Sequence, residues 1–348
     1  MNDRFACGSV VLNLSFSRNF GSKSQNFVKK IWVLPPCRRR IVFQVNDRVT
    51  PVNNPMHGGD EQRSSPSCVK AKAMLPHYID FGGAGQTVHL ATANGFPPEA
   101  YTPLAAPLTA HQRVVGYRSR PLWPGSRPET MRSWHDLAAD LLTDLETVTD
   151  APVVGSGHSL GGMMTLYAAL RRPERFNALV LLDPVILELR MLLLIGLMRL
   201  VRLHRRAPLV RGALRRRDHF PDVATARERY SGRGIFANWE PAALEGYLAG
   251  GFQPAPAGGV TLAWPTAWEA HIFALVPLDA WRVVTQVRQP LLIIRGTTSD
   301  VVTDRVWAGL QRRLPSARLV ELAGGHMLPM ERPQAVAAQI QAFLDDLR

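Results

Sequence analysis

The sequence predicts an α/β fold in which a mostly parallel central sheet carries helices on both faces. From residue 74 onward, short β-branched runs alternate with longer amphipathic stretches, which is the pattern of strand–helix units. The chain has 348 residues, of which 46% are hydrophobic and 20% charged, so it can bury a large core. One apolar run also passes directly into a helical pattern through a glycine-rich turn, as strands do in such folds.

The expected strands are short apolar runs, and the expected helices have apolar residues at a spacing of three or four. A first strand, at 78–81, is brief. The other strands are 87–93, 112–117, 152–158, 178–182, 290–295 and 317–322, and the helices are 129–148, 160–171, 304–314 and 333–347. In the last helix Val336, Ile340 and Phe343 share one face, which we expect to pack on the sheet.

Residue usage divides the chain near position 73. All five lysines and all three cysteines lie before that point, where 12 Lys and Arg face 4 Asp and Glu. We expect residues 1–73 to be an N-terminal extension that is either poorly ordered or not part of the native product. The core is expected to comprise 74–183 and 289–348. We expect residues 184–288, which lack strand character, to form a mainly helical cap inserted before the strand 290–295.

Composition excludes several classes of protein and of partner. Three cysteines without CxxC spacing predict neither a disulfide framework nor a metal site. The longest apolar run, 191–198, is too short to cross a bilayer, and no convincing signal peptide is present, so we expect a cytoplasmic location. The net charge of +13 is not interleaved with aromatic residues, so no nucleic-acid partner is expected. Residues 190–233 hold 12 Arg against 3 acids, which indicates either a solvated helical surface or weak contact with an anionic membrane.

The segment 157–161, GHSLG, follows an apolar strand and leads at once into a helical pattern. A strand that turns into a helix within one residue forces the central Ser159 into a strained conformation and presents its hydroxyl above the sheet. Gly157 and Gly161 lack side chains that would clash where strand and helix converge. Ser159 is therefore the candidate nucleophile.

A serine nucleophile needs a base, and the base needs an acid to orient it. Asp300 follows the strand 290–295, and His326 follows the strand 317–322, so both are expected at the same sheet edge as Ser159. This gives the order Ser, Asp, His that this architecture uses. Asp183, which ends the strand 178–182, is the alternative acid.

Acyl transfer also requires donors for the negative charge on oxygen. The backbone N–H of Leu160 follows the nucleophile, and the amide of Phe96 lies in the NGFPP loop after the strand 87–93. We expect these two groups to form an oxyanion hole.

These residues resemble the α/β-hydrolase superfamily, in its esterase, lipase and epoxide-hydrolase-like branch with a serine nucleophile. The resemblance covers residues 74–348 and rests on GHSLGG, the NGFP loop, LLIIRGTTSD and AGGHMLPMERP. It implies the α/β-hydrolase fold, with Ser159 as nucleophile, Asp300 as acid and His326 as base, and with 184–288 as the cap over the site.

The expected activity is hydrolysis of a carboxylic ester, or a related acyl bond, of a small and mostly apolar substrate, with no cofactor or metal. Four aromatic residues are the candidates for substrate contact, namely Trp123, Trp264, Trp268 and Phe273. Two alternatives stay open. One is a serine-triad enzyme of another kind, such as a C–C hydrolase, perhydrolase or lyase, and the other is a non-catalytic binding protein that retains the fold.

Overall fold

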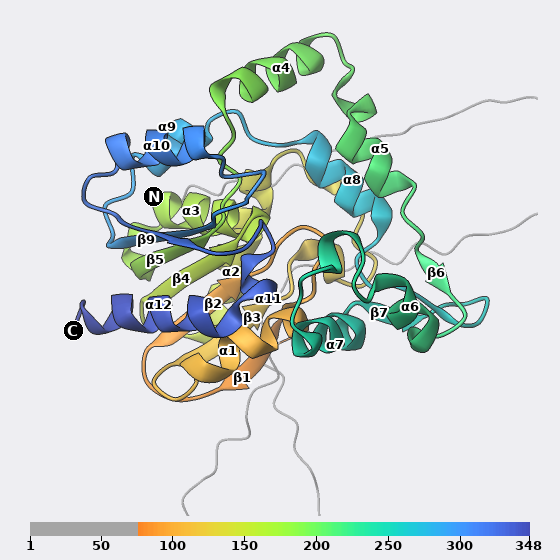
Figure 1. The fold of residues 1–348 in the computed structure, drawn as a ribbon, viewed down its shortest axis with the longest axis horizontal. Coiled ribbons are helices and arrows are strands. Elements are labelled where there is room, and N and C mark those ends of the chain that lie inside the picture. Colours follow the sequence, from red (N-terminus) through yellow and green to blue (C-terminus); the bar gives the residue numbers. More distant parts are fainter. Residues whose placement is uncertain (1–75) are drawn as a thin grey trace, which may run out of the picture. The chain divides into compact units, whose positions relative to one another are not determined.

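The computed structural model describes residues 76–348, and the expected extension, 1–73, lies outside them. Within the described part, every strand and helix expected outside the cap is present, with ends that differ by a few residues (Figure 1). The expected α/β fold class is confirmed: a mostly parallel sheet lies between two layers of helices.

The central sheet has seven strands in the order β1-β3-β2-β4-β5-β9-β10. Only β1 runs antiparallel to its neighbour, β3, and the other pairs are parallel. The carboxyl ends of β2, β4, β5, β9 and β10 therefore meet at one edge, which is where ligands bind in open α/β sheets. The strands are β1 (Tyr78–Gly82), β2 (Thr87–Ala91), β3 (Arg113–Tyr117), β4 (Val153–His158), β5 (Phe176–Leu182), β9 (Leu291–Gly296) and β10 (Arg318–Leu322).

Each face of the sheet is covered by its own apolar cluster. Alternate residues of a strand point to opposite faces, so Val153 and Val154 contribute to different clusters. One cluster includes α2 (Trp134–Val148), α3 (Leu160–Arg171), α9 (Ala280–Val284) and α10 (Asp304–Arg313). The other includes α1 (Thr102–Leu108), α11 (Leu328–Glu331) and α12 (Pro333–Asp345), where Val336, Ile340 and Phe343 face the sheet as expected.

The chain leaves the sheet after β5 and returns to it at β9, and most of this segment lies to the right of the sheet in Figure 1. It is mainly helical, but the expectation that it lacks strands was wrong. Three short strands form a second sheet in the order β6-β8-β7, in which β7 turns back through Gly258 and Gly259, both at positive φ. The elements are α4 (Leu189–Leu200), α5 (Pro208–Leu214), β6 (His219–Phe220), α6 (Val223–Tyr230), α7 (Pro241–Gly250), β7 (Phe252–Pro254), β8 (Val260–Leu262) and α8 (Thr266–Ala274).

No helix within residues 76–348 is both long and apolar enough to cross a bilayer. The leucine-rich helix α4 has 12 residues, whereas about 20 are needed to span the hydrocarbon core.

The buried His89 of β2 makes the stability of the fold depend on pH. Burial lowers the pKa of His89 from 6.5 to about 4, whereas the unfolded chain takes up this proton near the ordinary value. The stability that neutral His89 provides is therefore complete above pH 6.5 and is lost as the pH falls toward 4. From the pKa shift we expect a loss of about 3 kcal/mol in the free energy of unfolding.

Denaturant unfolding across this pH range, on wild type and on His89→Gln, measures the effect. The free energy of unfolding of His89→Gln should vary less with pH than that of wild type. His111→Gln, at an exposed histidine, should show the same pH dependence as wild type. An unchanged slope in His89→Gln would contradict this assignment.

Candidate active site

Ser159 lies in a sharp turn between β4 and α3, in a backbone conformation that residues other than glycine rarely adopt. Its φ is 54° and its ψ is −113°. The turn is held by a 3.0 Å hydrogen bond from the Ser159 N–H to the carbonyl of Leu182, at the end of the neighbouring strand β5. The serine is 8% exposed, and its hydroxyl lines a cavity at the carboxyl edge of the sheet.

The two glycines of the GHSLG segment are required by contact with backbone. A Cβ on Gly157 would lie 2.3 Å from the carbonyl carbon of Gly161, and a Cβ on Gly161 would lie 2.2 Å from the carbonyl oxygen of Ala91. Both distances are impossible for real atoms, and main chain cannot swing aside as a side chain can. These contacts support the explanation of the two glycines given from sequence.

His326 lies between Ser159 and a buried carboxylate. Its Nε2 atom is 3.0 Å from the Ser159 hydroxyl oxygen, and its Nδ1 atom is 2.7 Å from Oδ1 of Asp183. The carboxylate has no solvent exposure. It also accepts hydrogen bonds from the Gly296 N–H at 3.0 Å and the Ser299 hydroxyl at 2.7 Å. The hydrogen bonds from the end of β9 and its loop hold the Asp183 carboxylate in place, and the carboxylate in turn holds the imidazole of His326.

This geometry corrects the expectation about Asp300. The loop after β9 turns so that the Ser299 hydroxyl faces Asp183, and Asp300 is left exposed, with no hydrogen bond to His326 among the described residues. The alternative acid, Asp183, occupies the position that was expected for Asp300. A sequence signal for Asp183 exists: it ends β5, the strand beside β4, and so lies one strand away from the serine.

The loop after β2 lies beside the serine, and Phe96 and Leu160 both line the same cavity as Ser159. Gly95 has a φ of 88°, which allows the tight turn. The Asn94 side chain donates a 3.1 Å hydrogen bond to the carbonyl of Glu269 in α8, which ties the loop to the inserted segment. The Phe96 N–H donates only a long, 3.3 Å hydrogen bond to the carbonyl of Ala93. A better acceptor could therefore replace that carbonyl as its partner.

A chain of hydrogen bonds behind the serine connects this loop to His326. The Ala93 N–H donates to the Tyr101 hydroxyl at 2.9 Å, and that hydroxyl lies 2.8 Å from Nδ1 of His158. Nε2 of His158 lies 2.9 Å from the backbone carbonyl of His326, which can only accept. Burial, aided by nearby His326, holds the pKa of His158 well below its ordinary value. The neutral ring therefore donates through Nε2 and accepts from Tyr101 through Nδ1, so both ring nitrogens are used by groups other than the Ser159 hydroxyl.

The cavity above Ser159 has a volume of about 470 Å³. Most of its lining is apolar and comes from both the core and the inserted segment. Its polar side chains include Asn94, Glu269 and Asp300 beside Ser159 and His326. The apolar lining includes Trp134, Val185, Leu187, Leu209, Ile235, Ile272, Phe273 and Val276.

Of the four aromatic residues expected to contact substrate, only Phe273 lines this cavity. The indole of Trp123 stacks on His77, and the indole of Trp268 donates to Ser126. Trp264 is 3% exposed and packs in the core cluster on the α2–α3 face. These three expectations were wrong because the indoles fill structural positions. Sequence reasoning missed Trp134, the first residue of α2, whose indole N–H donates to the carbonyl of Ile272.

Among the described residues, no Lys or Arg lines the cavity to bind an anionic substrate. The nearby Arg216 is already paired with Glu269 at 2.8 Å. The described residues also contain no group of three His, Cys, Asp or Glu side chains placed to hold a metal ion.

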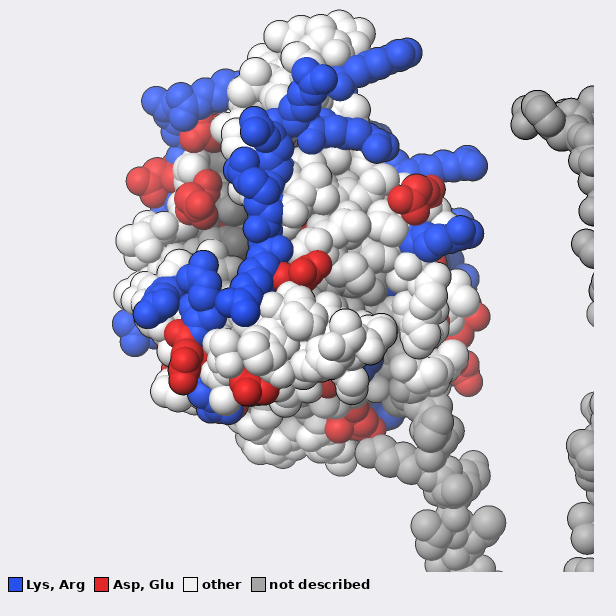
Figure 2. Space-filling view, turned by 90° about the vertical axis from the view of Figure 1, so that its right-hand side faces the viewer, with Lys and Arg blue, Asp and Glu red and all other residues white. Residues whose placement is uncertain are grey.

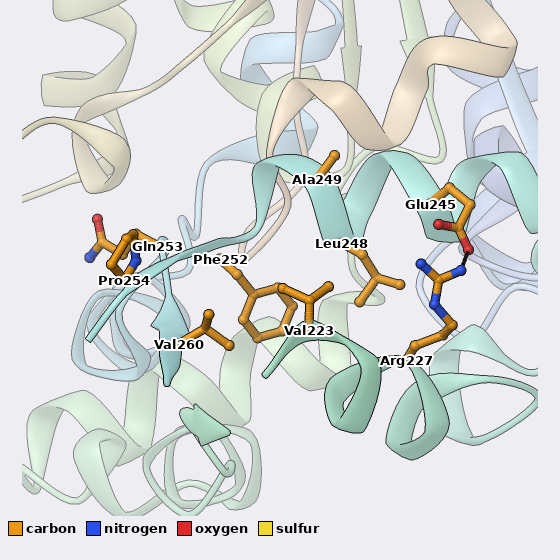
Figure 3. A pocket seen from close by; sticks show the side chains of 9 residues that line it. All are labelled: Val223, Arg227, Glu245, Leu248, Ala249, Phe252, Gln253, Pro254 and Val260. Atoms are coloured by element: carbon orange, nitrogen blue, oxygen red, sulfur yellow. Dashed lines mark hydrogen bonds and ion pairs between the residues drawn. The ribbon is translucent and has the colours of Figure 1, made fainter. Parts of the chain in front are cut away.

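A second cavity, of about 400 Å³, lies within the inserted segment between α6, α7 and the small sheet (Figure 3). An ion pair between Arg227 and Glu245 closes one end, and Leu248, Phe252 and Val260 form much of its wall. Its described lining contains no serine, cysteine or histidine, so it offers none of the side chains that face the first cavity at Ser159 and His326.

Comparison with known proteins agrees with this architecture. Residues 83–339 match the model of the alpha/beta hydrolase family. The chain is 29% identical over 246 residues to lipase LipV of Mycobacterium tuberculosis, which covers 70% of this chain and 83% of the relative. It is 25% identical over 263 residues to 2-(acetamidomethylene)succinate hydrolase of Mesorhizobium japonicum, with the same coverage of both chains.

Solved structures show the same fold. A crystal structure of E-2-(acetamidomethylene)succinate hydrolase superposes with a TM-score of 0.64 and 21% sequence identity, and covers 77% of this chain and 94% of its own. Because the family model spans most of the chain and includes all three residues of the Ser159–His326–Asp183 arrangement, the chain belongs to the alpha/beta hydrolase family.

Proposed function

We propose that this protein is a serine hydrolase that cleaves a neutral carboxylic ester, or a related acyl bond, through an acyl-enzyme. The observation that carries the proposal is the hydrogen-bonded series Ser159–His326–Asp183, of which Ser159 and His326 line a mostly apolar cavity. A serine is a weak nucleophile unless a base removes its proton, and these distances allow that transfer.

The residues divide the reaction into two steps. His326 takes the hydroxyl proton through Nε2 as Ser159 Oγ attacks the acyl carbon, and the same proton then protonates the leaving alcohol. A water activated by His326 hydrolyses the acyl-enzyme. Asp183 holds the imidazole in the tautomer with the proton on Nδ1 and stabilises the imidazolium. The N–H groups of Leu160 and Phe96 would donate to the oxyanion.

The lining of the cavity favours a neutral acyl group. An apolar wall stabilises a hydrocarbon chain by burial, whereas a buried carboxylate without a cation is strongly destabilised. The relative from Mesorhizobium japonicum acts on a succinate derivative, but the cavity here offers no unpaired Arg or Lys to a carboxylate. The relation to a lipase is therefore the more informative guide to substrate.

The nucleophile is tested by labelling with a fluorophosphonate, followed by intact-mass analysis, on wild type and Ser159→Ala. We expect a single adduct on wild type and none on the variant, because the reagent needs an activated serine. A folded wild type without an adduct, in the presence and absence of detergent, would favour the non-catalytic alternative.

Substitution of the two aspartates identifies the acid. Asp183→Asn should lower kcat on a neutral ester by about 10³- to 10⁴-fold, because an amide N–H facing Nδ1 selects the wrong histidine tautomer. Asp300→Asn should change kcat by less than about threefold, because its side chain has no bond to His326. The reverse order of effects would show that the acid is Asp300.

His158→Phe tests the role of the hydrogen-bond chain as a positioning device. The substitution keeps a ring in place but removes the bond to the His326 carbonyl, so we expect kcat per titrated site to fall about tenfold with little change in KM. Fluorophosphonate titration counts the competent sites, and His111→Phe, at an exposed histidine, is the control. If the variant loses only thermal stability and keeps its kcat per site, His158 is structural alone.

A matched pair of substrates tests the charge of the acyl group. p-Nitrophenyl butyrate and p-nitrophenyl hemisuccinate have the same chain length, but only the second carries a carboxylate. We expect kcat/KM to be about 10²-fold higher for the butyrate, since the carboxylate would be buried without a partner. Glu269→Gln removes the ion-pair partner of Arg216, whose charge could then attract the carboxylate. The ratio of the two kcat/KM values, butyrate over hemisuccinate, should therefore be smaller in this variant. An equal kcat/KM for both esters would contradict the neutral-substrate proposal.

A further inference from the structure

Helices α4 and α5 present an unusually apolar surface to solvent. Of the residues in α4, only Leu192 is buried. Leu193 is 75% exposed and Leu200 is 80% exposed, and Leu209 in α5 is 65% exposed. We call this surface the α4–α5 face, and its large exposed apolar residues are Leu189, Met191, Leu193, Leu194, Leu197, Leu200, Val201, Leu203, Leu209 and Leu214. An apolar patch of this kind marks a site of contact.

The same face is basic and carries no acid. Between residues 189 and 217 the sequence has nine arginines and neither Asp nor Glu. Figure 2 shows a column of Arg side chains beside the upper part of the molecule, which is mostly white and corresponds to the place of α4 in Figure 1. Within residues 76–348, the side chains of five exposed arginines of this stretch make no hydrogen bond or ion pair: Arg202, Arg205, Arg206, Arg211 and Arg215.

Three partners could cover this face, namely a second copy of the chain, residues 1–73 and a lipid surface, and their charge decides between them. A second copy of the chain would bring the same arginines against each other, which opposes association. Residues 1–73 are also basic, with 12 Lys and Arg against 4 Asp and Glu, so they do not complement it. An anionic lipid surface complements both properties, because leucines enter the acyl region while arginines reach the phosphates.

The face is continuous with the active-site cavity through α5. Leu209, exposed on the outer surface, also lines the cavity that contains Ser159, together with Gly212 and Ala213 of the same helix. Contact of α5 with a lipid surface would therefore place the entrance of the cavity next to the acyl chains.

We propose that the α4–α5 face docks on anionic lipid bilayers, with Leu193 and Leu200 inserted among the lipids and Arg205 and Arg206 bound to phosphate groups. The docking does not depend on the proposed hydrolase activity, because it uses none of the residues assigned to catalysis. It can therefore be tested on a protein that cannot turn over.

The experiment is co-sedimentation of full-length Ser159→Ala with large unilamellar vesicles. One set contains phosphatidylcholine alone, and the other contains phosphatidylcholine with phosphatidylglycerol. We expect binding to the second set only, and weaker binding at high salt, since the screening length falls from about 10 Å at 0.1 M to about 3 Å at 1 M.

Charge reversals test the arginines. Arg205→Glu/Arg206→Glu should weaken binding to the anionic vesicles by about thirtyfold or more. Arg171→Glu/Arg288→Glu makes the same change in net charge at exposed positions on other elements and should bind as the parent does. An equal loss in both pairs would show attraction by net charge alone and would overturn the proposal of a defined face.

Leu193→Ser and Leu200→Ser test insertion, and each should weaken binding roughly fivefold. Leu347→Ser, at an exposed leucine of the C-terminal segment, is the control and should have no effect. Unchanged binding in both α4 variants would overturn insertion by this face. Absence of binding to anionic vesicles, with sedimentation velocity showing a dimer that Leu193→Ser dissociates, would assign the face to self-association.

Discussion

The whole site depends on the backbone turn at Ser159. A φ of 54° at a non-glycine residue is unfavourable. It persists because the surrounding contacts do not allow the backbone another conformation. Because Gly157 has no Cβ, the main chain of Gly161 can pack directly against it, and because Gly161 has none, α3 can approach Ala91 in the same way. The Ser159 N–H is bonded to the neighbouring strand at Leu182. The hydroxyl is thus held on rigid elements, which is what a proton transfer over 3.0 Å to His326 requires.

The neighbouring groups reach the serine because parallel strands end at one edge of the sheet. Asp183 follows β5, adjacent to the strand of the nucleophile, and also has a positive φ, of 43°. Its carboxylate is completely buried, and hydrogen bonds from Gly296, Ser299 and His326 satisfy it. A buried charge is tolerable only with such partners. The β9 loop therefore supports the Asp183 carboxylate, and the β10 loop brings His326, the proposed base, against it.

Sequence reasoning predicted the strands and helices of the core because periodicity and turn residues are local signals. It also predicted Ser159 and His326 as neighbours, since both follow strands. It chose Asp300 as the acid and kept Asp183 as the alternative, and the structure reverses this choice. Both are acids at strand ends, and which of them faces His326 depends on how the loop after β9 turns. The indole of Trp268 was assigned to substrate contact for a similar reason: its bond to Ser126 spans 142 positions and leaves no local trace. The short strands of the inserted segment pair only with each other and have two or three residues, too few for a periodic pattern.

The inserted segment gives the cavity its apolar wall and the molecule its exposed, arginine-rich α4–α5 face, while the sheet edge gives the cavity its reactive groups.

The most direct test of this account is a crystal structure of the enzyme after reaction with a phosphonate ester. The account predicts phosphorus bonded to Ser159 Oγ and a phosphonyl oxygen that accepts hydrogen bonds, at about 3 Å, from the N–H groups of Leu160 and Phe96. Phosphorus on another side chain, or a phosphonyl oxygen turned away from both amides, would contradict it.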